Sequence, residues 1–352
     1  MRKVFALLSL GLSACIQAHA GSPPLEFKDL KYTSAKDADW PGGALALPEV
    51  AKVYGLATVP EVAYVELNPG GKETVVFIHG LGSYLKFWRY QLDAFAEAGY
   101  HVIALDMVGY GKSSKPSTFP YTMEAMADVV RELKNSLGVD KPILVGHSMG
   151  GQTALSYAIR YPDELKALVL TSPAGFEKFS RREKEWFSAA FSVAFVKSTP
   201  EEGIWGSVRK GNFYRWRDEL NWLIEERVRL SKAKEFDAYA YAQVKSVHGL
   251  THTEFTRASL DKITAPTIIV FGHQDRLIPS PFLHGGPTAE IMAYGHQGIK
   301  GSQLVGLERC GHTVQADCPS EYNEAVLGFL KRRLTGTPDE PEPLDGPPPE
   351  EE

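Results

Sequence analysis

The sequence has few cysteines and fewer positive than negative side chains. The first feature argues against a metal-binding protein, and the second argues against a nucleic-acid-binding protein. Neither the three cysteines nor the ten histidines show the paired spacing of a metal site. The net charge is −5 and no basic cluster stands out, so electrostatics give no case for nucleic-acid binding. The glycine strings lack the context of a dinucleotide-binding loop. We therefore expect no metal, no organic cofactor and no nucleic-acid partner.

Long apolar runs are also missing, apart from a short one at the amino terminus. The segment 4–14 is mostly apolar and follows Met1-Arg2-Lys3, which is typical of a signal peptide and too short for a membrane span. Ala18-His19-Ala20 predicts a signal peptide of residues 1–20, whereas Leu12-Ser13-Ala14-Cys15 resembles a lipobox, which would give a signal of residues 1–14 and a lipidated Cys15. The remaining alternative is a buried helix. We expect an exported protein, periplasmic or secreted, with membrane attachment only through a lipidated Cys15.

The carboxyl-terminal residues 335–352 are unlike the middle of the chain. From Gly336 onward they hold six prolines and seven carboxylates but a single leucine. Such a segment cannot bury enough apolar surface to order itself, so we predict a disordered acidic tail.

Strand and helix patterns alternate along most of the chain, and no internal repeat is evident. A mostly parallel central sheet with flanking helices is therefore the predicted α/β fold, with its core in residues 21–174 and 259–334. Helices are expected at 87–98, 122–137 and 319–334. The predicted strands are 62–67, 74–78, 101–107, 142–147, 165–171, 266–271 and 303–307.

The alternation breaks between residues 175 and 258, where no strand pattern occurs. Helical apolar stripes appear instead, one of them spanning 187–195 and another 220–228. Four of the six tryptophans lie here, which favours an apolar covering over the sheet. We predict an inserted helical cap.

Ser148 stands at the centre of Gly146-His147-Ser148-Met149-Gly150-Gly151, between a predicted strand and a predicted helix. In that context a G-x-S-x-G string forms a nucleophile elbow. The serine adopts strained backbone angles, and Gly146 and Gly150 supply the room that the sharp turn needs. Ser148 is therefore the candidate nucleophile.

A serine nucleophile needs a base and a carboxylate that orients this base, and both should follow later strands. Asp275 follows the strand 266–271, and His312 follows the strand 303–307. We predict Asp275 as the acid and His312 as the base, each with a simple turn residue as the alternative. Asp317 and Asp261 are weaker candidates for the acid because neither follows a buried strand directly.

Two backbone N–H groups are needed to stabilise the anion that forms when the serine attacks a carbonyl. Met149 supplies one because it follows the nucleophile, and Leu81 is the candidate for the other because it lies in the loop after the strand 74–78. His79 and Asp106 are expected to shape loops rather than to react.

Five ordered strings resemble the α/β-hydrolase family over roughly residues 50 to 334. They are His79-Gly80, Asp106-x-x-Gly109-x-Gly111-x-Ser113, Gly146-His147-Ser148-Met149-Gly150-Gly151, Gly272-x-x-Asp275 and Gly311-His312. Ser148 argues against the family's dehalogenases and epoxide hydrolases, which carry aspartate at the elbow. His147 and Met149 depart from the elbow of its proline iminopeptidases. The elbow resembles that of many esterases, lipases and carbon–carbon bond hydrolases.

The predicted triad and the resemblance imply a serine hydrolase that cleaves carboxylic esters of a small-molecule substrate through an acyl-enzyme. The aromatic residues of the predicted cap favour an apolar acyl or aryl group, and the alternative is that they only pack against one another. A carbon–carbon bond hydrolase with the same triad is the nearest alternative, and the export signal weighs against it. A non-catalytic binding protein on a hydrolase scaffold is the alternative from another class. The stretch 282–303 is rich in glycine and predicts a loop beside the pocket.

Cys310 and Cys318 lie on either side of His312 in the sequence. In an exported protein they would be an even pair in an oxidising compartment, and a bond between them would stiffen the loop that carries the base. Two free thiols are the alternative.

Overall fold

The computed structural model describes residues 23–335, so the predicted signal segment, Cys15 and the tail after Thr335 lie outside the described residues. An eight-stranded sheet has the order β1-β2-β4-β3-β5-β6-β7-β8. Only the β1–β2 and β2–β4 pairs are antiparallel, so the predicted mostly parallel sheet is confirmed. The strands are β1 (Gly42–Ala46), β2 (Glu61–Leu67), β3 (Thr74–Ile78), β4 (His101–Leu105), β5 (Ile143–His147), β6 (Ala167–Thr171), β7 (Thr267–Gly272) and β8 (Gln303–Leu307).

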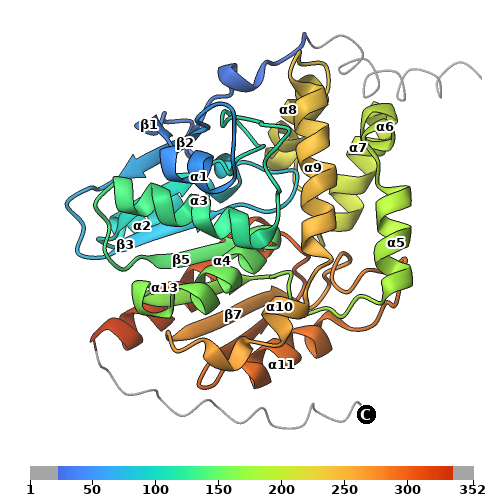
Figure 1. Cartoon of the computed structure of the whole chain (residues 1–352). Helices are drawn as coiled ribbons and strands as arrows, with labels where there is room; N and C mark the ends of the chain where they lie inside the picture. The colour runs from blue at the N-terminus through green and yellow to red at the C-terminus, as the bar shows by residue number, and fades with distance from the viewer. Residues whose placement is uncertain (1–22, 336–352) are drawn as a thin grey trace, which may run out of the picture.

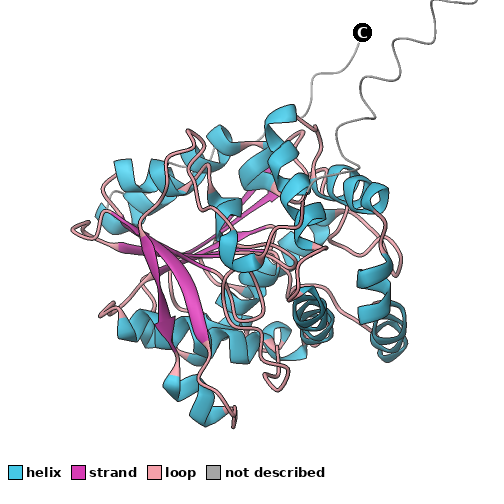
Figure 2. Ribbon diagram, turned by 90° about the horizontal axis from the view of Figure 1, so that it is seen from above, coloured by secondary structure: helices cyan, strands magenta, loops and turns pink. Residues whose placement is uncertain are grey.

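Helices lie on both sides of the sheet (Figure 2). The five residues each of β4, β5 and β6 are all buried, as expected of parallel strands that are covered on both faces. The core helices are α1 (Pro48–Val53), α2 (Leu92–Glu97), α3 (Met123–Ser136), α4 (Met149–Arg160), α11 (Thr288–Gly298), α12 (Val314–Asp317) and α13 (Pro319–Thr335). Because β3 to β8 all run parallel, the loops that follow them meet at one edge of the sheet, where the predicted site residues lie.

Between β6 and β7 the chain forms helices and no strand within its described residues, and these helices stand beside the sheet in Figure 1. They are α5 (Arg181–Ala190), α6 (Val193–Ser198), α7 (Glu201–Ser207), α8 (Asn221–Leu230), α9 (Phe236–Leu250) and α10 (Glu254–Arg257). In α8 the predicted stripe is buried at Leu223, Ile224 and Val228.

Three local expectations were wrong. The stripe 187–195 is not one helix, because the Ser192 side chain accepts a hydrogen bond from the Phe195 N–H and starts α6 as an N-cap. The expected helix 87–98 is a short 3₁₀ turn, η2 (Leu85–Trp88), followed by α2. The expected loop 282–303 contains α11, where Gly295 provides packing space: a Cβ there would lie 2.2 Å from the ring of Phe176.

Candidate active site

Ser148 occupies the sharp turn between β5 and α4. Its backbone angles are φ 51° and ψ −113°, a strained region for a residue with a side chain. Hydrogen bonds hold this conformation: the Ser148 N–H donates to the Thr171 carbonyl at 3.0 Å, and the Ser148 carbonyl accepts from the N–H groups of Gln152 and Ala174. The turn is therefore fixed by its neighbours on β6 and α4.

The glycines of the elbow are required by space. A Cβ at Gly146 would lie 2.2 Å from the Gly150 carbonyl oxygen, and a Cβ at Gly150 would lie 2.2 Å from that of Ile78. A Cβ at Gly80 would lie 2.8 Å from His147 Nδ1 and 3.2 Å from Ser148 Cβ. The loop after β3 thus packs directly against the elbow.

His312 and Asp275 form a buried hydrogen-bonded pair. His312 Nδ1 lies 2.7 Å from Asp275 Oδ2, and the side chains are 4% and 0% exposed. The other Asp275 oxygen accepts from the backbone N–H groups of Leu277 and Ile278. A proton on Nδ1, facing the carboxylate, leaves Nε2 with a free lone pair, and Nε2 has no hydrogen-bond partner within residues 23–335. This is the protonation that a catalytic base requires, although the described residues show no hydrogen bond between Ser148 Oγ and His312 Nε2.

His147 fixes the position of His312 through the backbone. Its Nε2–H donates to the His312 carbonyl at 3.1 Å, and the two rings lie 4.9 Å apart. Burial holds the pKa of His147 well below its ordinary value, so the ring is neutral. Its position just before Ser148 is the one sequence signal for this contact, and no motif predicts a role for it.

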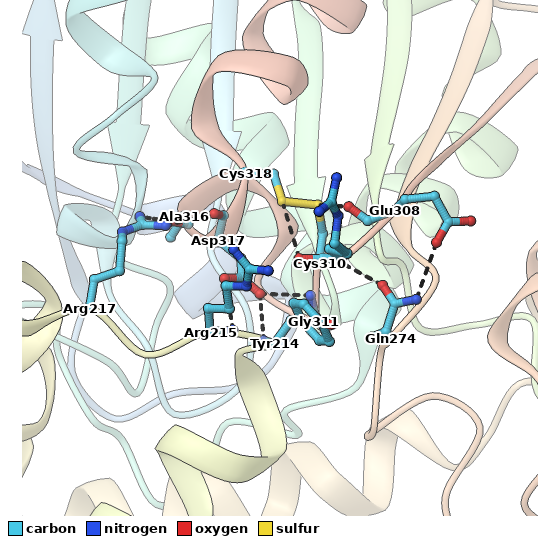
Figure 3. Close-up of a disulfide and its surroundings, with 11 residues drawn as sticks. Tyr214, Arg215, Arg217, Gln274, Glu308, Cys310, Gly311, Ala316, Asp317 and Cys318 are labelled. Carbon is cyan, nitrogen blue, oxygen red and sulfur yellow. Dashed lines mark hydrogen bonds between the residues drawn. A yellow bond between two sulfur atoms is a disulfide. The ribbon is translucent and has the colours of Figure 1, made fainter.

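Asp317, the weaker acid candidate, does not contact the imidazole of His312. It accepts hydrogen bonds from the N–H groups of Gly311, at 2.8 Å, and Tyr214, at 2.6 Å, while Arg217 donates to the Asp317 carbonyl (Figure 3). Asp317 therefore joins the His312 loop to the cap. Asp261, the other weaker candidate, is exposed on a 3₁₀ turn.

A disulfide joins Cys310 to Cys318 across the loop that carries His312 (Figure 3). The Cys310 N–H also donates to the side chain of Gln274, which lies next to Asp275. The loop of the base is thereby attached both to the start of α13 and to the loop of the acid.

The N–H groups of Leu81 and Met149 have no hydrogen-bond acceptor within the described residues, which leaves both free for an oxyanion. Met149 is the first residue of α4, where the helix dipole also favours negative charge. His79 is structural: its Nδ1–H donates to the Gly80 carbonyl and its Nε2 accepts from the Met107 N–H. Burial lowers the pKa of His79 to about 4, so it stays neutral.

Asp106 joins two loops of the site. One carboxylate oxygen accepts from the Leu85 N–H at 2.8 Å, and the other accepts from the Lys112 N–H at 2.7 Å and from the Tyr32 hydroxyl. Burial raises the pKa of Asp106 to about 6, against the opposing effect of these hydrogen bonds. These hydrogen bonds agree with the expected loop-shaping role of Asp106. No sequence pattern predicts Tyr32 as its partner.

Within residues 23–335 no cluster of three or more His, Cys, Asp or Glu side chains could hold a metal ion. In the same range, no helix is long and apolar enough to cross a membrane.

The sequence and the fold of the chain match those of known proteins. The model of the alpha/beta hydrolase fold matches residues 73–318. A 2-hydroxy-6-oxononadienedioate/2-hydroxy-6-oxononatrienedioate hydrolase of Klebsiella pneumoniae is 30% identical over 274 residues, covering 74% of this chain and 88% of the relative. The human monoacylglycerol lipase ABHD6 is 27% identical, with 75% of this chain and 77% of the relative covered.

A solved structure of a probable hydrolytic enzyme from Pseudomonas aeruginosa superposes with a TM-score of 0.76 at 25% identity, covering 88% of this chain and 98% of that one. An esterase from Exiguobacterium antarcticum shares the fold, with a TM-score of 0.65 at 24% identity and coverage of 78% and 96%.

Proposed function

The chain belongs to the alpha/beta hydrolase fold family and is a hydrolase, and we propose that it cleaves carboxylic esters through an acyl-serine intermediate. The observation that carries the proposal is the buried His312–Asp275 pair, which is linked through His147 to the elbow that holds Ser148 in a strained backbone conformation. In a family of hydrolases, this combination activates a serine hydroxyl for attack on a carbonyl.

In the proposed mechanism, Ser148 Oγ attacks the ester carbonyl as His312 Nε2 takes its proton. The negative charge that develops on the carbonyl oxygen accepts hydrogen bonds from the N–H groups of Leu81 and Met149. His312 then donates the proton to the leaving alkoxide, and Asp275 stabilises the imidazolium between these steps. Water, deprotonated by His312, then attacks the acyl carbon, and His312 returns the proton to Ser148 Oγ as the acid leaves.

The side chains closest to two glycines of the loop after β3 bear on the choice of substrate. The polar side chains nearest to Gly80 and Gly82 are His147, Gln243 and Tyr239, and burial lowers the pKa of His147, so all three are uncharged and suit an uncharged ester. The cap adds aromatic and apolar contacts here, because α9 places Tyr239 beside Gly82 and Ala242 beside Gly109. An apolar acyl or aryl group fits these surroundings.

Carbon–carbon bond hydrolysis is the second candidate, because the relative at 30% identity carries that activity in its name. The named substrates of that relative are dienedioates and trienedioates, which carry two carboxylates, unlike the uncharged ester proposed for this chain.

A substrate panel separates the two candidates. Wild-type protein and Ser148→Ala should be assayed with p-nitrophenyl esters of varied chain length beside a 2-hydroxy-6-oxo-dienoate. We expect Ser148-dependent ester turnover that exceeds dienoate cleavage at equal substrate concentration. Faster dienoate cleavage would reverse the assignment, and turnover of neither would refute the proposed ester activity.

We further propose that the chain is exported, after cleavage behind Ala20 or before Cys15. The Cys310–Cys318 disulfide supports an oxidising compartment. Amino-terminal sequencing and intact mass of protein expressed from the full chain distinguish a free Gly21 from a lipidated Cys15, and a cytoplasmic protein that retains Met1 would contradict export.

A further inference from the structure

The residues just before the sheet form a segment that the family match at 73–318 does not include. We call residues 23–40 the N-terminal strap. Although many of its side chains are exposed, four apolar ones are nearly covered, namely Phe27 at 1%, Leu30 at 2%, Tyr32 at 8% and Trp40 at 8% exposure. Burial of this kind means that the strap is packed into the molecule rather than lying on it.

The middle of the strap, at Tyr32, reaches the loop that supplies the proposed oxyanion donor. The Tyr32 hydroxyl donates to the Asp106 carboxylate, which in turn accepts the Leu85 N–H at 2.8 Å. Leu85 closes the loop 79–85 that contains Leu81. Tyr32 therefore acts on this loop through a buried carboxylate, and its ring also lies 6.4 Å from that of Tyr84 in the same loop.

An earlier strap residue, Phe27, reaches the same loop through the cap. The ring of Phe27 lies 5.0 Å from that of Tyr239 on α9, and the Tyr239 hydroxyl donates to the Gly82 carbonyl at 3.0 Å. Gly82 is the residue directly after Leu81. The loop is thus held at two points shortly after the free Leu81 N–H, by Tyr239 at Gly82 and by Asp106 at Leu85.

The strap is also bonded to the cap by its backbone. The Leu25 N–H donates to the Arg229 carbonyl at 3.2 Å, and the Arg229 side chain donates to the Pro23 carbonyl at 3.0 Å. On the core side, Arg89 donates to the Ser34 carbonyl at 2.6 Å. The strap therefore bridges the end of α8 and the turn that follows the loop 79–85.

From these contacts we propose that the N-terminal strap positions the oxyanion loop, with Tyr32 and Phe27 as positioning residues. The inference rests on the proposed function for its catalytic consequence. A displaced Leu81 N–H would weaken transition-state stabilisation more than ground-state binding, because the oxyanion exists only after attack. Loss of a strap contact should therefore lower kcat and leave KM nearly unchanged.

The test compares Tyr32→Phe and Phe27→Leu with Lys31→Ala, a matched control at an exposed strap position. On a soluble p-nitrophenyl ester, we expect each positioning variant to lose about tenfold in kcat with KM within about twofold of wild type. The affinity for a boronic acid that forms a tetrahedral anion on the serine should fall by the same factor. If both variants match Lys31→Ala in kcat and in boronate affinity, the proposal is overturned.

Hydrogen exchange supplies a readout that needs no activity. Backbone amides of the segment 79–90 should exchange faster in Tyr32→Phe than in wild type or Lys31→Ala, with the segment 143–160 unchanged. Unchanged exchange in 79–90 would overturn the strap's role whatever the activity shows. If the wild type turns over no ester but Tyr32→Phe still exchanges faster in the segment 79–90, only the proposed function is refuted, and the role of the strap stands.

Discussion

Asp275 is the acid of the site because it alone combines burial with a hydrogen bond to His312. Asp275→Asn should keep the fold but lose on the order of 10² to 10⁴ in kcat, because an amide cannot balance the imidazolium charge and can favour the wrong tautomer. Steady-state kinetics on the best ester of the panel measure this loss. Asp261→Asn is the matched control at an exposed position. If this control is as inactive as Asp275→Asn, Asp275 is no longer assigned as the acid.

Gly80 tests how closely the loop after β3 must approach the elbow. A Cβ at this position would crowd His147 Nδ1 and Ser148 Cβ, so the loop that carries Leu81 would have to move. Gly80→Ala should lower kcat by roughly 10- to 100-fold, since small displacements of reacting groups are costly. Gly70→Ala is the control, because nothing lies within 4 Å of its Cβ position. Equal rates for the two variants would contradict the described approach.

His284, in the loop after β7, pairs with two carboxylates of the cap. His284 Nδ1 lies 2.8 Å from Glu183 Oε1, and its Nε2 lies 2.9 Å from Glu177 Oε1. Burial lowers the pKa of His284, but the two carboxylates outweigh this effect and raise it above its ordinary value. The hydrogen bond from His284 holds the pKa of Glu183 at about 2.

The sign of the pH dependence follows from the raised pKa of His284. The stabilisation of the fold by the His284 ion pairs is fully present below the pKa of histidine in the unfolded chain, about 6.5. It is lost as the pH rises through the higher pKa of His284 in the folded state. The difference in unfolding free energy between wild type and His284→Asn should therefore be larger at pH 6 than at pH 9, as measured by urea denaturation. His252→Asn serves as a control at an exposed histidine, and a His284 difference that does not change with pH would contradict the ion-pair account.

Much of the sheet and the candidate triad could be read from the sequence, for a physical reason. Strands buried on both faces appear as continuous apolar runs, and catalytic residues at their ends appear just after those runs. β1 was missed because its Gly42-Gly43 start has little strand propensity. The Tyr32–Asp106 contact joins residues 74 positions apart, and no local pattern encodes it.

The Cys310–Cys318 disulfide spans the loop that carries His312, so its loss should affect both the free energy of unfolding and the order of the site. Closing the short loop from Cys310 to Cys318 should contribute about 2 to 3 kcal/mol to the free energy of unfolding in the chain-entropy model. Cys310→Ser/Cys318→Ser should show this loss in urea denaturation, together with faster hydrogen exchange around His312. Non-reducing peptide mapping of exported protein checks the bond itself, and free alkylated thiols in active enzyme would contradict it.

The central claim is that Ser148 is the nucleophile of this hydrolase. The most direct test is labelling of the folded wild-type protein with a fluorophosphonate probe, followed by peptide mass spectrometry, with Ser148→Ala as the control. We predict one label on Ser148, none on the variant, and a loss of about 10⁴ to 10⁶ in kcat in Ser148→Ala while its thermal unfolding stays normal. A label on another residue, or more than a tenth of the wild-type rate in Ser148→Ala, would contradict the account.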